Sequence, residues 1–300
     1  MYEADVQEEN ILQCPVRLVD ASAIYPRTLQ EQQFDGFLKW LSPTPFRQHH
    51  ARHSSNRLAG SARWLFNHPQ YLSWKGSSSS SVLLLHGVSG CGKTNLVSAV
   101  VDACLEEHDK TPLAAPIAYF YCGDSRADPD EVMRSLTRQL TVIDETTHQV
   151  HEQIALEYER RQAEAKLDGF EVPRLRSHEC AGLLLDVLDF NPAVVVVDGV
   201  DEIDPKERHS LLESLMRIKD ESSSVVKVFV SSRTDSSMFA HLPEAMSVYV
   251  RDVDTRRDMD LFVRYRLSME IENRRLLDGD VSKDLQDDLT RFLIDRAGEM

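Results

Sequence analysis

The chain has 300 residues, of which 42% are hydrophobic and 28% charged, and its formal net charge is −15. This length supports one large or two modest domains with a substantial core, and the composition is typical of a globular protein that folds in water. The excess of carboxylates disfavours a general binder of nucleic acid or of anionic membranes, because phosphate groups would be repelled.

The N-terminus and the cysteines bear on location. The start "MYEADVQEEN" lacks the basic and apolar regions of a signal peptide, and no stretch approaches the ~20 apolar residues of a membrane helix. The cysteines are odd in number and scattered, at Cys14, Cys91, Cys104, Cys122 and Cys180. This pattern favours a reducing, cytoplasmic environment over a disulfide framework or a zinc site.

The first quarter of the chain is predicted to be a helical lead-in. Residues 1–28 show no clear period and stay unassigned, whereas Leu29–Leu41 has the spacing of an amphipathic helix. The Pro-, His- and Arg-rich stretch "SPTPFRQHHARHSSNR" is expected to be a flexible joint, followed by a helix around Ser61–His68. Its three histidines have no neighbouring carboxylate or cysteine in the sequence, so we expect them to make contacts rather than hold a metal. "KGSSSSS" at 75–81 is typical of a polar linker.

After this linker, short apolar runs alternate with helical patterns, which indicates a parallel sheet with helical crossovers. The runs are Val82–His86, Ile117–Cys122, Ala193–Asp198, Val225–Ser231 and Ser247–Val250. The helical patterns are 94–106, 130–142, 147–166, 178–188 and 206–217. Beyond Asp254 we predict helices alone.

A phosphate-binding loop follows the first run. The stretch "HGVSGCGKT" satisfies G-x-x-x-x-G-K-[ST] with Gly87, Gly90, Gly92, Lys93 and Thr94. Glycines let the backbone curl until consecutive N–H groups point at an anion, and the start of the next helix adds its positive dipole end. Lys93 is predicted to reach the β- and γ-phosphates, and the Thr94 hydroxyl to bind Mg²⁺. Ser89 and Cys91 complete the predicted nucleotide-binding loop.

An acidic cluster follows the third run, in "AVVVVDGVDEID". The uninterrupted valines 194–197 indicate a strand buried on both faces. Asp198, at its end, is the predicted metal ligand, and Asp201 and Glu202 are placed to orient or deprotonate a water molecule. Asp204 precedes Pro205 and is predicted to cap the next helix.

A cation follows the fourth run, in "VKVFVSSRTD". Arg233 stands just past the strand, where a guanidinium would sense a γ-phosphate and stabilise the charge that develops during hydrolysis. Ser231 and Ser232 precede it and would assist.

In this order, the pieces resemble a STAND-class P-loop NTPase, in particular the nephrocystin-like NACHT module of fungal NOD-like receptor proteins with ankyrin or WD repeats. The resemblance runs from Trp40 to the end, through "WLSPTPFRQHHARHSSNRLAGSARWLFNHPQYLSW", "AYFYCGDSRADPDEVMRSLTRQL", "VVVVDGVDE" and "VSSRTD". It implies a three-layer α/β fold with a five-stranded parallel sheet of order 5-1-4-3-2. Together with the patterns above, we predict an unassigned segment 1–28, a helical lead-in 29–75, a P-loop NTPase domain 76–252 and an incomplete helical lid domain 253–300.

The resemblance also implies a function. It implies a signalling switch that binds ATP or GTP with Mg²⁺, hydrolyses it slowly and self-associates in the triphosphate state. Arg57 and Gly60 would lie near the base, although Gly60-Ser61-Ala62 replaces the family's Gly-Thr-Gly, and Thr234 stands where proline often follows the arginine. The sequence ends at Met300 within a helical segment that the family continues into a winged helix, so effector and repeat domains are expected in a longer receptor, or the chain is a minimal NTPase.

Two other classes stay open. One is a working P-loop enzyme, either a kinase or a AAA+-like motor, although we find no arginine-rich lid between the third and fourth strands. The other is an inert nucleotide-binding scaffold. No N-K-x-D motif selects guanine, so the base is undetermined.

Overall fold

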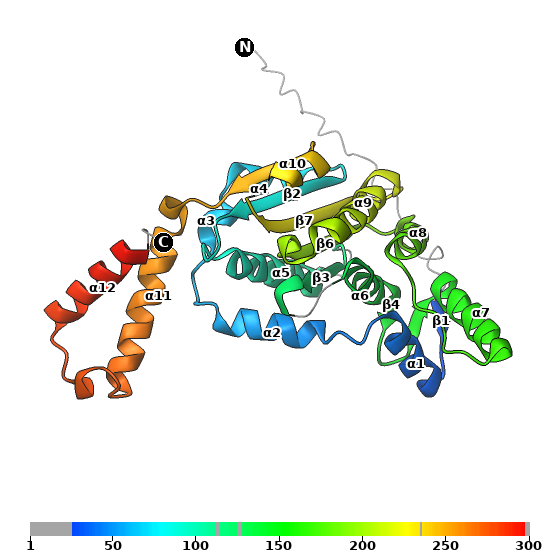
Figure 1. Cartoon of the computed structure of the whole chain (residues 1–300), viewed down its shortest axis with the longest axis horizontal. Helices are drawn as coiled ribbons and strands as arrows, with labels where there is room; N and C mark the ends of the chain where they lie inside the picture. Colours follow the sequence, from blue (N-terminus) through cyan, green and yellow to red (C-terminus); the bar gives the residue numbers. More distant parts are fainter. Residues whose placement is uncertain (1–25, 112–113, 125–127, 235, 298–300) are drawn as a thin grey trace, which may run out of the picture.

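The computed structural model describes residues 26–111, 114–124, 128–234 and 236–297. Residues 1–25 of the unassigned segment, and Cys14 with them, lie outside the described residues. The centre of the fold is a five-stranded parallel sheet of order β3-β6-β7-β2-β8 (Figure 1). Its strands are β2 (Ser81–Gly87), β3 (Ile117–Tyr121), β6 (Ala193–Asp198), β7 (Val226–Arg233) and β8 (Met246–Tyr249). Numbered along the chain and read from the β8 edge, this is the order 5-1-4-3-2, so the predicted α/β fold class is confirmed.

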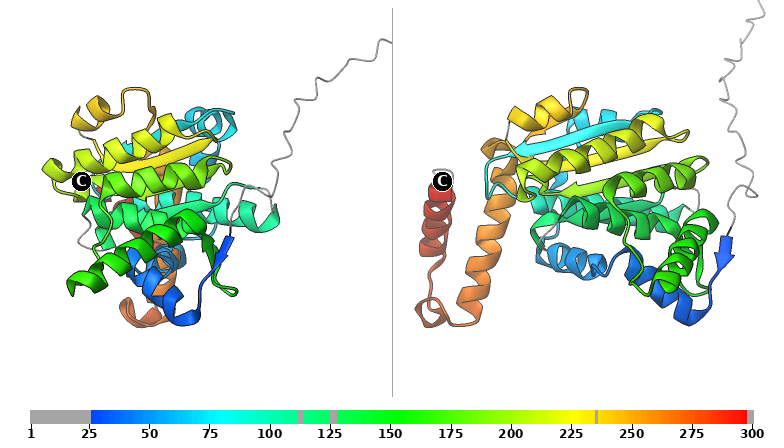
Figure 2. Two further views of the ribbon diagram at one scale, coloured as in Figure 1. Left: turned by 90° about the vertical axis from the view of Figure 1, so that its right-hand side faces the viewer. Right: turned by 45° about the vertical axis from the view of Figure 1, so that its right-hand side comes forward.

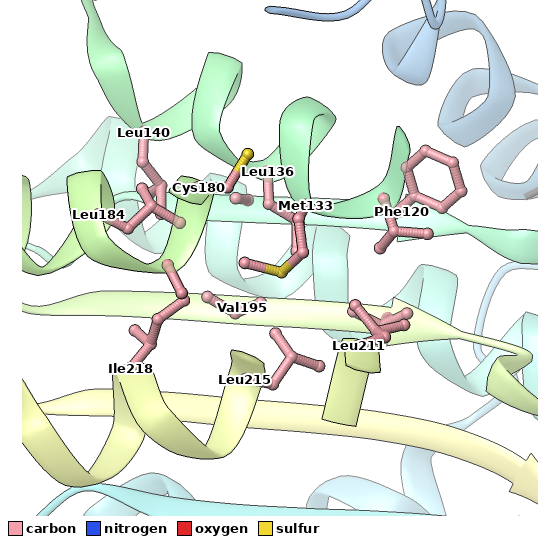
Figure 3. Packing of buried hydrophobic residues seen from close by; sticks show 14 of the residues in the cluster. Phe120, Met133, Leu136, Leu140, Cys180, Leu184, Val195, Leu211, Leu215 and Ile218 are labelled. Atoms are coloured by element: carbon pink, nitrogen blue, oxygen red, sulfur yellow. The ribbon is translucent and has the colours of Figure 1, made fainter. Parts of the chain in front are cut away.

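Both faces of the sheet are covered, which explains why the strands do not alternate. Val195 and Val197 of β6 belong to one hydrophobic core, whereas Val194 and Val196 belong to a second core. The first core includes side chains of α6 (Pro129–Thr141), α8 (Ser177–Leu188) and α9 (Pro205–Glu221), and Figure 3 shows Met133, Leu184 and Leu211 of these helices around Val195. The second core includes α5 (Lys93–Lys110). Because side chains of one strand point to opposite faces in turn, burial on both faces requires apolar residues at every position.

The lead-in is helical, with α1 (Glu31–Leu41), α2 (Phe46–Asn56), α3 (Arg63–Phe66) and α4 (Pro69–Gly76). The expectation of a flexible joint at 42–57 was wrong, because α2 occupies most of it. Two carboxylates hold α2 in place: His50 Nε2 lies 2.9 Å from Asp102 of α5, and His53 Nε2 lies 2.8 Å from Asp124, which follows β3. Such tertiary contacts override the weak helical pattern of the sequence.

The lead-in packs into the same cores as the sheet. Trp74 of α4 is fully buried, and its indole N–H donates to the carbonyl of Val228 in β7 at 3.1 Å. Its ring meets Phe229 edge-on, with centroids 5.6 Å apart. The "KGSSSSS" stretch connects α4, which ends at Gly76, to β2, which begins at Ser81. These two elements share a hydrophobic core, because Trp74 of α4 and Leu83 of β2 belong to the same cluster.

A second, antiparallel sheet was not expected. Its order is β1-β5-β4, with β1 (Pro26–Thr28), β5 (Gln149–His151) and β4 (Val142–Asp144). The helix expected from 147 begins only at Glu152, as α7 (Glu152–Asp168). Three-residue strands carry too short a pattern to be recognised, and long-range pairing decides them.

The C-terminal part is helical, as expected. After α10 (Ser236–His241) and β8 come α11 (Asp252–Glu272), a short 3₁₀ turn η4 (Leu277–Gly279) and α12 (Lys283–Ala297). The two long helices form a hairpin that projects beyond the end of the sheet (Figure 2). Within the described ranges, no helix combines the length and apolar character needed to cross a bilayer.

Candidate functional site

The loop between β2 and α5 has the backbone of a phosphate-binding loop. Gly90 and Gly92 have φ of 81° and 91°, in the left-handed region that favours glycine. A β-carbon at Gly87 would lie 2.9 Å from Cys91 Sγ and 3.2 Å from the β-carbon of Val250. The loop therefore packs against Val250, the residue after β8, with no space for a side chain at Gly87. These local constraints match the glycine spacing of the motif.

Lys93 begins α5 and turns back over the loop. Its Nζ donates to the carbonyl oxygens of Gly87 and Val88, each at 2.9 Å. These are neutral acceptors, so the lysine charge is not neutralised by them. An arriving phosphate would meet a cation that is already held at the mouth of the loop.

Thr94 and Asp198 come from different elements and meet. The Thr94 hydroxyl donates to Asp198 Oδ2 at 2.7 Å, and the Ser231 hydroxyl donates to Asp198 Oδ1 at 2.5 Å. The Gly199 N–H in turn donates to Ser231 Oγ at 2.9 Å. Burial raises the pKa of Asp198, while the hydrogen bonds from Ser231 and Thr94 oppose this shift. A hydroxyl and a carboxylate oxygen side by side are the hard donors that Mg²⁺ prefers, so these residues fit the predicted metal.

Arg233, at the end of β7, meets the acidic turn after β6. This turn is the 3₁₀ helix η3 (Val200–Glu202). Asp201 accepts from the Arg233 backbone N–H at 2.9 Å and pairs with its Nε at 3.0 Å. Glu202 Oε1 lies 3.0 Å from Arg233 Nη2. The structure therefore brings all three predicted catalytic side chains together, with the guanidinium bound to both carboxylates.

These groups surround one cavity of about 280 Å³ at the carboxyl ends of the strands. It is lined by Ser89, Gly90, Gly92, Lys93, Thr94, Asn95, Gly123, Asp198, Gly199, Asp201, Glu202, Ser231 and Arg233. Gly87 and Cys91 are not among the lining residues, and they lie close to each other within the loop. Asn95 and Gly123 were not predicted: Asn95 directly follows the motif, and Gly123 lies in the turn η2 (Cys122–Asp124) after β3. The alignment of parallel strand ends is the signal that would have pointed to Gly123.

Arg57 and Gly60, predicted near the base, are not among the residues that line this cavity. Arg57 forms an ion pair with Asp102 of α5, which also accepts from Ser54 at 2.8 Å. Gly60 has a φ of 85° and lies in the turn before α3. Their role toward a base stays a prediction.

The parallel sheet of order 5-1-4-3-2, with its glycine loop between β2 and α5, is that of a P-loop NTPase. Residues 60–233 match the family model described as nephrocystin 3, N-terminal, and this segment is more than half of the chain. The chain therefore belongs to the nephrocystin 3 N-terminal family.

Other comparisons add less. No curated protein matches the chain. Among solved structures, it is similar to the ORC1 protein of Aeropyrum pernix in complex with DNA, with a TM-score of 0.42, 16% identity and coverage of 85% of this chain and 69% of that one. For the Aeropyrum pernix ORC2 protein the TM-score is 0.45 and the identity 15%, with coverage of 78% of this chain and 68% of that one. For Drosophila ORC bound to DNA the TM-score is 0.38 and the identity 14%, with coverage of 99% of this chain and 66% of that one. At these scores, the likenesses carry no argument about what this chain binds.

Proposed function

We propose that this chain is a nucleotide-binding NACHT module of the STAND class, a conformational switch that binds ATP or GTP with Mg²⁺ and hydrolyses it slowly. The observation that supports this most is the meeting of Thr94 and Asp198 beneath the cavity, because it joins the glycine loop to the acidic strand end. In this proposal residues 76–252 form the NTPase domain, residues 253–300 form part of a lid, and the triphosphate state self-associates.

Each side chain has a chemical role in the proposal. Lys93 and the loop N–H groups hold the β- and γ-phosphates, and Thr94 and Asp198 hold Mg²⁺, which would neutralise phosphate charge. Glu202 orients a water molecule and takes its proton. The water oxygen forms a bond to the γ-phosphorus as the bond to the β–γ bridging oxygen breaks, giving a nucleoside diphosphate and inorganic phosphate. Arg233 stabilises the charge on the transferring group.

The test separates binding from hydrolysis. Binding of fluorescent ATP and GTP analogues and release of phosphate are measured for the wild type and for Glu202→Gln. We expect the variant to bind these analogues at least as tightly as the wild type does and to release phosphate about 10²–10⁴-fold more slowly. The control is Glu221→Gln, an exposed glutamate of α9 paired with Arg217, which should change neither quantity. Failure of the wild type to bind either nucleotide would refute the proposal, and unchanged turnover in Glu202→Gln would remove Glu202 from the mechanism.

A further inference from the structure

The adjacent carboxylates Asp201 and Glu202 hold Arg233 in different ways. The Asp201 side chain is 11% exposed and makes two contacts, one to the backbone N–H of Arg233 and one to its Nε. The Glu202 side chain is 47% exposed and makes a single contact, to the terminal Nη2. The arginine is thus anchored at its base by one acid and held at its tip by the other.

These contacts differ in how easily they break. An ion pair between solvent-exposed side chains contributes little, because water screens it and two flexible side chains must be ordered. The Glu202–Nη2 contact is of this kind. The Asp201 contacts are better shielded and include the backbone, so they would persist while the tip of the guanidinium moves.

A triphosphate in the cavity would compete with Glu202 for that tip. Arg233 lines the same cavity as the glycine loop and Lys93, so the terminal phosphate of a bound triphosphate would add negative charge beside Nη2. Guanidinium binds phosphate through strong, charge-assisted hydrogen bonds. A diphosphate lacks this group and leaves Arg233 with Glu202.

We propose that Asp201 is a positioning residue that anchors Arg233, and that the tip of Arg233 exchanges between Glu202 and the γ-phosphate. Glu202 is then freed to hold water only when a triphosphate is bound. This inference rests on the proposed function and deepens it, since it separates the roles of two adjacent acids and makes their contact a sensor of the terminal phosphate.

The test is the preference for a non-hydrolysable triphosphate analogue over the diphosphate, measured as a ratio of dissociation constants with Mg²⁺. Arg233→Ala should lower this preference about tenfold or more, the size expected for a charged hydrogen bond. Asp201→Asn keeps an acceptor for the backbone N–H but loses the ion pair, so it should lower the preference to a smaller extent. Glu202→Gln removes the negative charge that competes for the tip of Arg233 and should raise the preference. Arg217→Ala, an exposed arginine paired with Glu221 on α9, is the matched control and should leave the ratio unchanged.

A double variant distinguishes positioning from a general structural effect. If Asp201 acts through Arg233, Asp201→Asn should cause no further loss of preference in the Arg233→Ala background. Diphosphate affinity, measured on the same samples, reports whether each variant folds. The inference is overturned if Asp201→Asn leaves the ratio unchanged, if its effect adds fully to that of Arg233→Ala, or if Glu202→Gln lowers the preference. Absence of binding of either nucleotide by the wild type would instead refute the proposed function itself.

Discussion

Replacing Ser231 by alanine would test how Asp198 is held. The Ser231 hydroxyl is fully buried, donates to Asp198 Oδ1 and accepts from the Gly199 N–H. The variant leaves a buried carboxylate oxygen and the half-buried Gly199 N–H each without one hydrogen-bond partner, and an unsatisfied buried polar group costs about 1–3 kcal/mol. We therefore expect the free energy of unfolding to fall by about 2–4 kcal/mol.

The assay is urea unfolding without nucleotide or Mg²⁺, with the slope m required to stay constant. Ser232 offers a matched control, because it is equally buried and its hydroxyl has no hydrogen-bond partner in the part of the chain that the structure describes. Ser232→Ala should change the free energy of unfolding by less than about 0.5 kcal/mol or raise it. Equal losses in the two variants would refute the reasoning.

Three further predictions concern the loop, the lead-in and pH. Lys93→Ala should weaken triphosphate binding about 10- to 100-fold, the range of a charged hydrogen bond, with an unchanged circular dichroism spectrum; unaltered affinity would exclude a phosphate contact. Trp74→Ala should lower the free energy of unfolding by about 3–5 kcal/mol in urea, because a large buried ring is lost, while Leu72→Ala on the exposed side of α4 should change it little. Burial lowers the pKa of His50, which faces Asp102, His53 and Arg57, so the unfolded chain takes up the proton first as pH falls. The free energy of unfolding should therefore fall as pH drops below about 6.5, and His50→Gln should make this fall less steep. An equally steep fall in the variant would show that His50 does not contribute.

The central sheet was predictable because its strands are continuous runs of apolar residues. Val194–Val197 and Val82–Leu85 are buried on both faces, and a strand in that position leaves a continuous apolar run in the sequence. The glycine loop was predictable for a different reason, since positive φ at Gly90 and Gly92 leaves few alternatives to glycine.

Other features depend on partners far along the chain. Helix α2 carries few apolar residues, and the contacts that hold it include those to Asp102 and Asp124, which the local sequence does not reveal. The direction of the Ser231 hydroxyl was also hidden: the pattern placed this serine beside Arg233, whereas its hydrogen bond is to Asp198 on the neighbouring strand. The different roles proposed for Asp201 and Glu202 likewise rest on their three-dimensional contacts with Arg233 and not on their adjacency.

The proposed function requires that the glycine loop and the acidic strand end form one site for a magnesium-bound triphosphate. The most direct measurement is calorimetric titration of a non-hydrolysable triphosphate, with and without Mg²⁺, into the wild type, Thr94→Val and Asp198→Asn. We predict that Mg²⁺ strengthens binding to the wild type and that both substitutions, made on different elements, remove this enhancement. An enhancement that survives intact in either variant would contradict the account.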